Sequence, residues 1–130
     1  MKKMKLQDCC IFISDGDHQA PPKSDKGVPF ITISNITTDN RIDFSNVMYV
    51  PLEYYEQLSE KSKAIKNDIL YSVVGSFGKP VLIEEDRKFV FQRHIAILRP
   101  NLEKVIPEFL YYTLLNPQFY TVEDYLAIGA

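Results

Sequence analysis

Apolar residues in the middle of the chain form short runs that turn residues interrupt, while those near the C-terminal end recur at helical spacing. Short runs rich in β-branched and aromatic residues, bounded by Gly, Pro, Asn or Asp, are typical of strands. The pattern therefore predicts strands at 28–36, one or two short strands within 41–50, and strands at 69–74, 81–83 and 89–98.

Helices are predicted on both sides of these strands. The clearest covers 105–116, where Pro107 stands in the first turn and Phe109, Leu110 and Leu114 have helical spacing. Three further helical segments are expected, at 5–13, at 52–62 behind Pro51, and after Pro117. Strands grouped in the middle with helices at the ends predict an α+β fold. We expect a small, twisted, mixed or antiparallel sheet core with flanking helices, formed by a single domain over 1–130.

The polar residues between the strands predict two hairpins and one unusual strand. The segment GSFGKP joins the strands at 69–74 and 81–83, and EEDRK joins the next pair. The predicted strand 89–98 contains Gln92, Arg93 and His94 within an otherwise apolar run. Alternation along a strand would place Gln92 and His94 on one face and Arg93 on the other.

Composition and charge narrow the classes of protein that the chain could be. The 130 residues carry a formal net charge of −2, with the acidic excess after residue 100 and the lysines and arginines in local groups. A locally basic face on a nearly neutral domain is compatible with this pattern. No apolar run approaches the length of a membrane span, and no export signal is recognised, so a cytoplasmic protein is expected.

The cysteines and the glycine–lysine loop resemble known sites without matching them. Cys9 and Cys10 are neighbours that fit a reducing compartment, and two small core residues are favoured over a metal site with His18. The spacing G-x-x-G-K, with Pro80 and a strand next, differs from a phosphate-binding loop that opens a helix. Pro117 in the NPQF segment at 116–119 is explained as the residue that ends the preceding helix. We therefore expect no metal, no cofactor and no catalytic residue.

Two functions remain open at the level of the sequence. Asp68, Asp86 and Lys88 could form a metal-dependent nuclease site, because such sites need converging carboxylates near a lysine. The segment EFLYYTLLNPQFY could instead dock on a partner helix as a protein-interaction surface without DNA binding.

Four segments together resemble one target recognition domain of the type I restriction–modification specificity subunits. They are DGDHQAPPKSDKGVPFITISNI, RIDFSNVMYV, NDILYSVVGSFGKPVLIEEDRKFVFQRHIAILRPN and FLYYTLLNPQFY, and they are followed by the closing IGA. The order of the segments is the family's own, from about residue 5 to 130. Asn67 stands where the family commonly has glycine. The family usually continues past the closing segment, so the chain is expected to be truncated at its C-terminus.

The resemblance implies a domain that reads double-stranded DNA and does no chemistry itself. Modification subunits would methylate the target, and a restriction and translocase subunit would cut unmodified DNA. A homodimer of the truncated piece is also compatible with the resemblance. In combination with side-chain chemistry, it suggests the following residues. The base or groove candidates are Ser76, Phe77, Lys79, Gln92, Arg93 and His94. The phosphate candidates are Lys23, Lys26, Lys61 and Lys63, with Lys79 as a further one. The residues expected to shape the loops are Asp15, Gly16, His18, Gly75 and Gly78.

Overall fold

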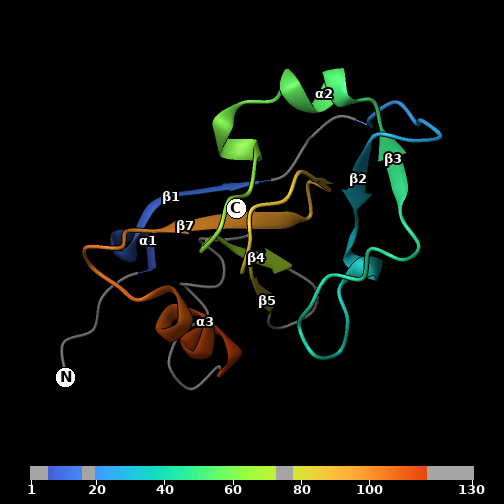
Figure 1. Ribbon diagram of the computed structural model, residues 1–130. Helices are drawn as coiled ribbons and strands as arrows, with labels where there is room; N and C mark the ends of the chain where they lie inside the picture. The colour runs from blue at the N-terminus through green and yellow to red at the C-terminus, as the bar shows by residue number, and fades with distance from the viewer. Residues whose placement is uncertain (1–5, 16–19, 73–77, 117–130) are drawn as a thin grey trace.

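A computed structural model describes residues 6–15, 20–72 and 78–116 (Figure 1). Seven strands form two sheets within these residues. The strands are β1 (Cys10–Asp15), β2 (Val28–Ile31), β3 (Met48–Val50), β4 (Ile69–Ser72), β5 (Lys79–Leu82), β6 (Val90–Phe91) and β7 (Ile95–Pro100). The helices are α1 (Leu6–Cys9), α2 (Leu52–Glu56) and α3 (Pro107–Leu115), with 3-10 turns η1 (Ile33–Asn35) and η2 (Glu60–Ser62).

The larger sheet has four strands in the order β1-β7-β4-β5, and every neighbouring pair is antiparallel. The hairpin predicted between the strands at 69–74 and 81–83 is thus confirmed as the pair β4 and β5. The strand β5 lies at an edge of the sheet, where Pro80 is tolerated because an edge strand has no neighbour on one side.

The smaller sheet has the order β3-β2-β6, and its short strand β6 runs parallel to β2. Strand β6 covers only Val90 and Phe91, and the chain passes directly from it into β7 of the larger sheet. The predicted single strand 89–98 is therefore wrong. Two strands in different sheets replace it, because Phe91 finds its pairing partner in Ile31 whereas Ile95 pairs with Ser72.

The core has two layers because successive strand residues point to opposite faces of the larger sheet. Ile69, Tyr71 and Leu98 face α3 and pack against Leu110 and Leu114. The opposite face is covered by the smaller sheet and the chain around it. The buried residues of that layer are Ile31, Ala64, Leu70, Val81, Ile83, Phe89, Phe91, Ile95 and Ile97.

The α+β architecture with flanking helices is confirmed, as is the helix with Pro107 at its start. The helix predicted over 5–13 is wrong beyond Cys9, because Cys10–Asp15 pairs with β7 as a strand. Strand pairing across a sheet overrides weak local preference in so short a segment. The helix predicted after Pro117 lies outside the described residues. Among the described residues, no helix is long and apolar enough to cross a membrane.

Candidate nucleic-acid interface

The register of the four-stranded sheet brings the end of β1, the end of β4 and the start of β7 together at one end of the sheet. Asp15 at the end of β1 pairs with Ala96, and Ser72 at the end of β4 pairs with Ile95 and with Lys79. Asp15, Ser72 and the turn before Ile95 therefore lie at the same end of the sheet. Residues that are distant in sequence come to one end through strand pairing alone.

Gln92, Arg93 and His94 form the tight turn that carries the chain from β6 into β7. The Gln92 amide donates to the Ile31 carbonyl at 2.9 Å, and the Ile95 amide donates to the Gln92 carbonyl at 2.9 Å. Arg93 and His94 are exposed and Gln92 is half-buried. The expectation that Gln92 and His94 share a strand face is wrong, because this segment is a turn. The result is a short polar turn anchored at both ends in sheet hydrogen bonds.

The glycine–lysine loop is anchored by the buried side chain of Tyr71. The Gly78 amide donates to the Tyr71 hydroxyl at 3.1 Å. A Cβ atom at Gly78 would lie 2.1 Å from the Tyr71 ring and 2.3 Å from the Ser72 carbonyl oxygen, so only glycine fits without a shift. The close approach of Tyr71 and Ser72 therefore requires glycine at position 78. Gly75, Ser76 and Phe77 lie outside the described residues, as do Gly16 and His18.

Lys79 is held within the fold. Its ammonium group donates to the carbonyl of Thr37, and the Asn40 side-chain amide donates to the Pro80 carbonyl at 2.9 Å. Together these contacts fix the turn at 37–40 against the first residues of β5. The Lys79 side chain thus stabilises the base of the loop, and the charge that it offers to a ligand is partly satisfied already.

The other lysine candidates differ in how freely they meet solvent. Lys23, Lys26 and Lys61 are exposed, and the Lys61 ammonium lies 5.7 Å from the centre of the Phe12 ring. The Lys63 side chain is only 16% exposed, with its ammonium 3.7 Å from Glu60 and 3.4 Å from the Glu56 carbonyl. Lys61 and Lys63 precede β4, at the end of the sheet opposite to the turn 92–94.

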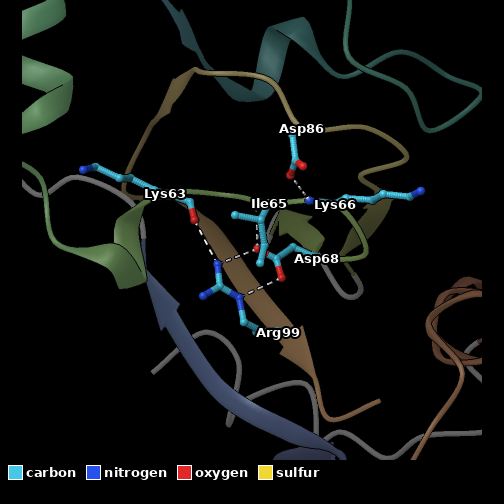
Figure 2. Close-up of polar contacts among 6 residues, drawn as sticks. All are labelled: Lys63, Ile65, Lys66, Asp68, Asp86 and Arg99. Carbon is cyan, nitrogen blue, oxygen red and sulfur yellow. Dashed lines mark hydrogen bonds and ion pairs between the residues drawn. The ribbon is translucent and has the colours of Figure 1, made fainter.

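An ion pair that sequence reasoning did not single out holds the lysine-bearing segment. Arg99 donates through Nε and Nη2 to the two carboxylate oxygens of Asp68, at 3.0 and 2.9 Å (Figure 2). The same Nη2 donates to the Lys63 carbonyl at 3.0 Å, and Asp68 also accepts the Ile65 amide at 2.8 Å. Asp86 accepts the Lys66 amide at 2.8 Å. The backbone from Lys63 to Lys66 is thereby tied to β7 and to the loop after β5.

A signal for this pair was present in the sequence. Arg99 ends an apolar run that must be buried, and a buried charge needs a partner. Asp68 stands directly before another apolar run, so the two charges were candidates for each other. Lys66, which is exposed and follows Lys61 and Lys63 in the sequence, was likewise not among the predicted phosphate contacts.

The two carboxylates of the nuclease alternative have structural roles. Asp68 is 1% exposed and paired with Arg99, and Asp86 caps the Lys66 amide. In the part of the chain that the structure describes, no group of three or more His, Cys, Asp or Glu side chains could hold a metal ion. These contacts argue against metal-dependent cleavage by Asp68 and Asp86.

The two cysteines are free thiols at the junction of α1 and β1. Cys9 is buried against the core, in agreement with the interpretation of small core residues, and Cys10 is half-buried. Burial, followed by the neighbouring Cys9 and Asp68, raises the pKa of the Cys10 thiol to about 12. Burial and Asp8 also raise the pKa of Cys9. Both thiols are therefore kept protonated, which disfavours metal ligation and nucleophilic chemistry.

Comparison with known proteins decides the family. The model of the type I restriction modification DNA specificity domain matches residues 1–122 of the chain. The chain belongs to this family. The resemblance inferred from the sequence segments is thus confirmed. Specificity domains are the non-catalytic component of these systems, which agrees with the expectation of no enzymatic activity.

Individual relatives support the same assignment. The specificity domain is 30% identical over 95 residues to the type I restriction enzyme EcoBI specificity subunit of Escherichia coli, covering 73% of this chain and 20% of that subunit. Its fold matches the HsdS subunit from Thermoanaerobacter tengcongensis with a TM-score of 0.60 at 21% identity, covering 93% of this chain and 30% of that one. A structure from work on complex assembly and conformational transition of the type I restriction–modification system matches with a TM-score of 0.61 at 22% identity, covering 93% and 31%. The chain therefore spans less than a third of the length of these proteins.

The backbone conformation explains why asparagine can replace glycine at position 67. Asn67 has a φ of 77°, in the left-handed region that glycine adopts without cost. Asparagine is among the few other residues that tolerate this conformation. The backbone amide of Asn67 donates to the Ile83 carbonyl at 2.8 Å, so the turn before β4 is intact.

Proposed function

We propose that this specificity domain reads a short double-stranded DNA sequence with the end of the four-stranded sheet where the turn 92–94 lies. The observation that carries the proposal is the register that brings the last residues of β1 and β4, Asp15 and Ser72, to the same end as this turn. Sequence-specific reading needs polar side chains on a rigid support, since only a fixed side chain can discriminate base edges.

The turn supplies suitable base-reading groups. Arg93 is exposed and can donate two hydrogen bonds to a guanine, while His94 beside it can donate or accept. The half-buried Gln92 has its backbone in the sheet, so its side chain starts from a fixed position. Ser76 and Phe77 of the hairpin remain proposed groove contacts, with Gly75, Gly16, His18 and Asp15 as loop-shaping residues.

Phosphate contacts are proposed for the exposed lysines. Lys61 is the main proposed phosphate contact. Lys66, in the anchored segment that follows it, is a further one. Lys23 and Lys26 lie on the segment that leads into β2 and are also exposed. Lys63 and Lys79 contribute less under this proposal, because internal contacts engage both ammonium groups. Such contacts strengthen binding to any sequence and set the register on the duplex.

The proposal extends to the assembly. By analogy with the relatives, the domain directs methyltransferase (modification) subunits and a restriction and translocase subunit to the sequence that it reads, in the cytoplasm where these meet DNA. It requires no cofactor of its own, since recognition consists of hydrogen bonds and charge contacts.

A segment exchange tests this function. Residues 1–130 are placed in a full-length specificity subunit, which is expressed with its modification subunits, and methylated adenines are mapped across the genome. Replacing the segment by another recognition domain should change one half of the methylated motif and leave the other half unchanged. A motif that persists after the exchange would show that recognition lies elsewhere in the subunit.

A further inference from the structure

The outer edge of β5 carries backbone groups that face away from the sheet. The Ile83 amide donates to the Asp68 carbonyl at 2.9 Å, and the Ile83 carbonyl accepts the Asn67 amide at 2.8 Å, so Ile83 faces β4. Backbone groups alternate sides along an extended chain, and the amide and carbonyl of Leu82 therefore point outward. The described parts of the chain supply no hydrogen-bond partner to either group.

A groove of about 780 Å³ runs along this edge. One wall is the turn around Asn40, which packs on β5, and the other is α3 with Tyr111 and Tyr112. Residues 81–85 line the groove between these walls, with Phe44 and Phe89 beside them. In Figure 1 β5 lies between α3 and the loop that follows η1. The unpaired edge of Leu82 is therefore accessible from a hollow large enough for side chains of another chain.

The charge of the groove is negative. Glu84, Glu85 and Glu108 line it, and the described residues offer none of them an ion-pair partner. The two arginines of the groove are engaged: Arg41 lies 3.7 Å from Asp39, and Arg87 stacks 3.5 Å from the centre of the Phe44 ring. Net negative potential repels DNA phosphates and attracts cationic side chains.

The pKa of Tyr111 in the groove is raised by its surroundings. Burial is the main cause that raises the pKa of Tyr111, followed by Tyr112, and Glu84 and Asp39 raise it further against the opposing effect of Arg41. Carboxylates from the turn around Asn40 and from the segment between the walls thus act on the same hydroxyl group.

We propose that this groove binds an extended segment of a partner protein that carries lysine or arginine side chains, and that the segment adds to β5 as a further strand. Leu82 would exchange backbone hydrogen bonds with it, while its cations meet Glu84, Glu85 and Glu108 and its apolar side chains meet the aromatic walls. Strand addition ends at Pro80, whose carbonyl already accepts the Asn40 amide. The site is independent of the proposed DNA-reading end.

The test uses the ¹⁵N-labelled 130-residue chain and a heptapeptide of alternating lysine and valine. Titration should give saturable shifts of the Leu82 and Glu84 amide signals. The same peptide N-methylated at alternate residues, which cannot donate along one edge, should bind about tenfold more weakly, the equivalent of one or two lost hydrogen bonds. A heptapeptide of glutamate and valine should not bind detectably.

Variants of the domain distinguish charge-dependent binding of the peptide from non-specific binding. Glu84→Gln with Glu85→Gln should weaken the lysine peptide about threefold for each charge removed, whereas Glu53→Gln with Glu56→Gln on α2 should leave binding unchanged. The absence of saturable shifts at Leu82 would overturn the site. Equal binding of the N-methylated peptide would overturn strand addition, and equal binding of the glutamate peptide would overturn the charge argument. None of these outcomes bears on DNA reading.

Discussion

Arg99 holds both carboxylate oxygens of Asp68, with Nε 3.0 Å from Oδ1 and Nη2 2.9 Å from Oδ2 (Figure 2). Asp68 is 1% exposed, and the guanidinium also binds the Lys63 carbonyl. One ion pair thus joins β7 to the residue before β4 and, through the Lys63 carbonyl, to the lysine-bearing segment Lys61–Lys66 that precedes it. Since the proposed phosphate contact Lys61 lies at the start of that segment, its position depends on a contact that is itself far from solvent.

Breaking this pair should destabilise the domain strongly. Arg99→Met leaves an uncompensated buried carboxylate, which costs about 3–5 kcal/mol. Urea unfolding followed by circular dichroism measures the loss. As a matched control, Glu60→Gln removes the pair of Lys63 with the exposed Glu60 carboxylate, which is worth at most about 1 kcal/mol. Combining Arg99→Met with Asp68→Leu should restore part of the stability, because no buried charge remains. Similar losses for Arg99→Met and Glu60→Gln would contradict the assignment.

Asn67 should accept glycine but not alanine. Its φ of 77° costs a residue with a Cβ about 1–2 kcal/mol, and asparagine pays less than most. Asn67→Ala should therefore lower the free energy of unfolding by about 1 kcal/mol, while Asn67→Gly should change it by less than about 0.5 kcal/mol. Thermal or urea unfolding of the two variants side by side decides the matter. A loss with glycine equal to that with alanine would point to the side chain instead of the backbone.

Arg93 and Lys61 should affect DNA binding in different ways. Arg93→Ala should cost about 1–3 kcal/mol on the target sequence and relax discrimination there, whereas Lys61→Ala should weaken all sequences alike and reduce the salt slope by about one. Fluorescence anisotropy with target and mutated duplexes over a range of salt measures both, in the full subunit with its modification partners. Lys63→Ala is the matched comparison, since its ammonium is already engaged and its salt slope should change less than that of Lys61→Ala. Uniform loss in both Arg93→Ala and Lys61→Ala would refute the division of roles.

The Cys10 thiol should react slowly and with an unusual pH dependence. Its pKa of about 12, against an ordinary value of 9.0, keeps it protonated at neutral pH. In a Cys9→Ser variant, the rate of iodoacetamide modification should still rise about tenfold per pH unit near pH 10, where an ordinary thiol levels off. Because the folded pKa is the higher one, the thiol's contribution to stability is complete below pH 9.0 and is lost as the pH rises toward about 12. A rate that levels off near pH 9 would show that Cys10 is not shielded.

The amino-acid sequence by itself determined the local elements whose signals lie within a few residues. Pro107 marked the start of α3, and the apolar runs around the glycine–lysine loop indicated the β4–β5 hairpin. The family segments identified the domain, whereas the reason for glycine at position 78, the close approach of Tyr71, came only from the structure. Periodicity and turn chemistry are short-range properties, so they can be read without the fold.

Only the tertiary structure decided which strands pair. The run from Phe89 to Leu98 has one continuous pattern, yet it divides at Arg93 because its two halves pair in different sheets. The same long-range pairing made Cys10–Asp15 a strand and left the outer edge of Leu82 without a partner among the described residues. The partnership of Asp68 and Arg99, thirty-one positions apart, depends on the β4–β7 register. Pairing energy comes from residues distant in sequence, and a local pattern cannot specify them.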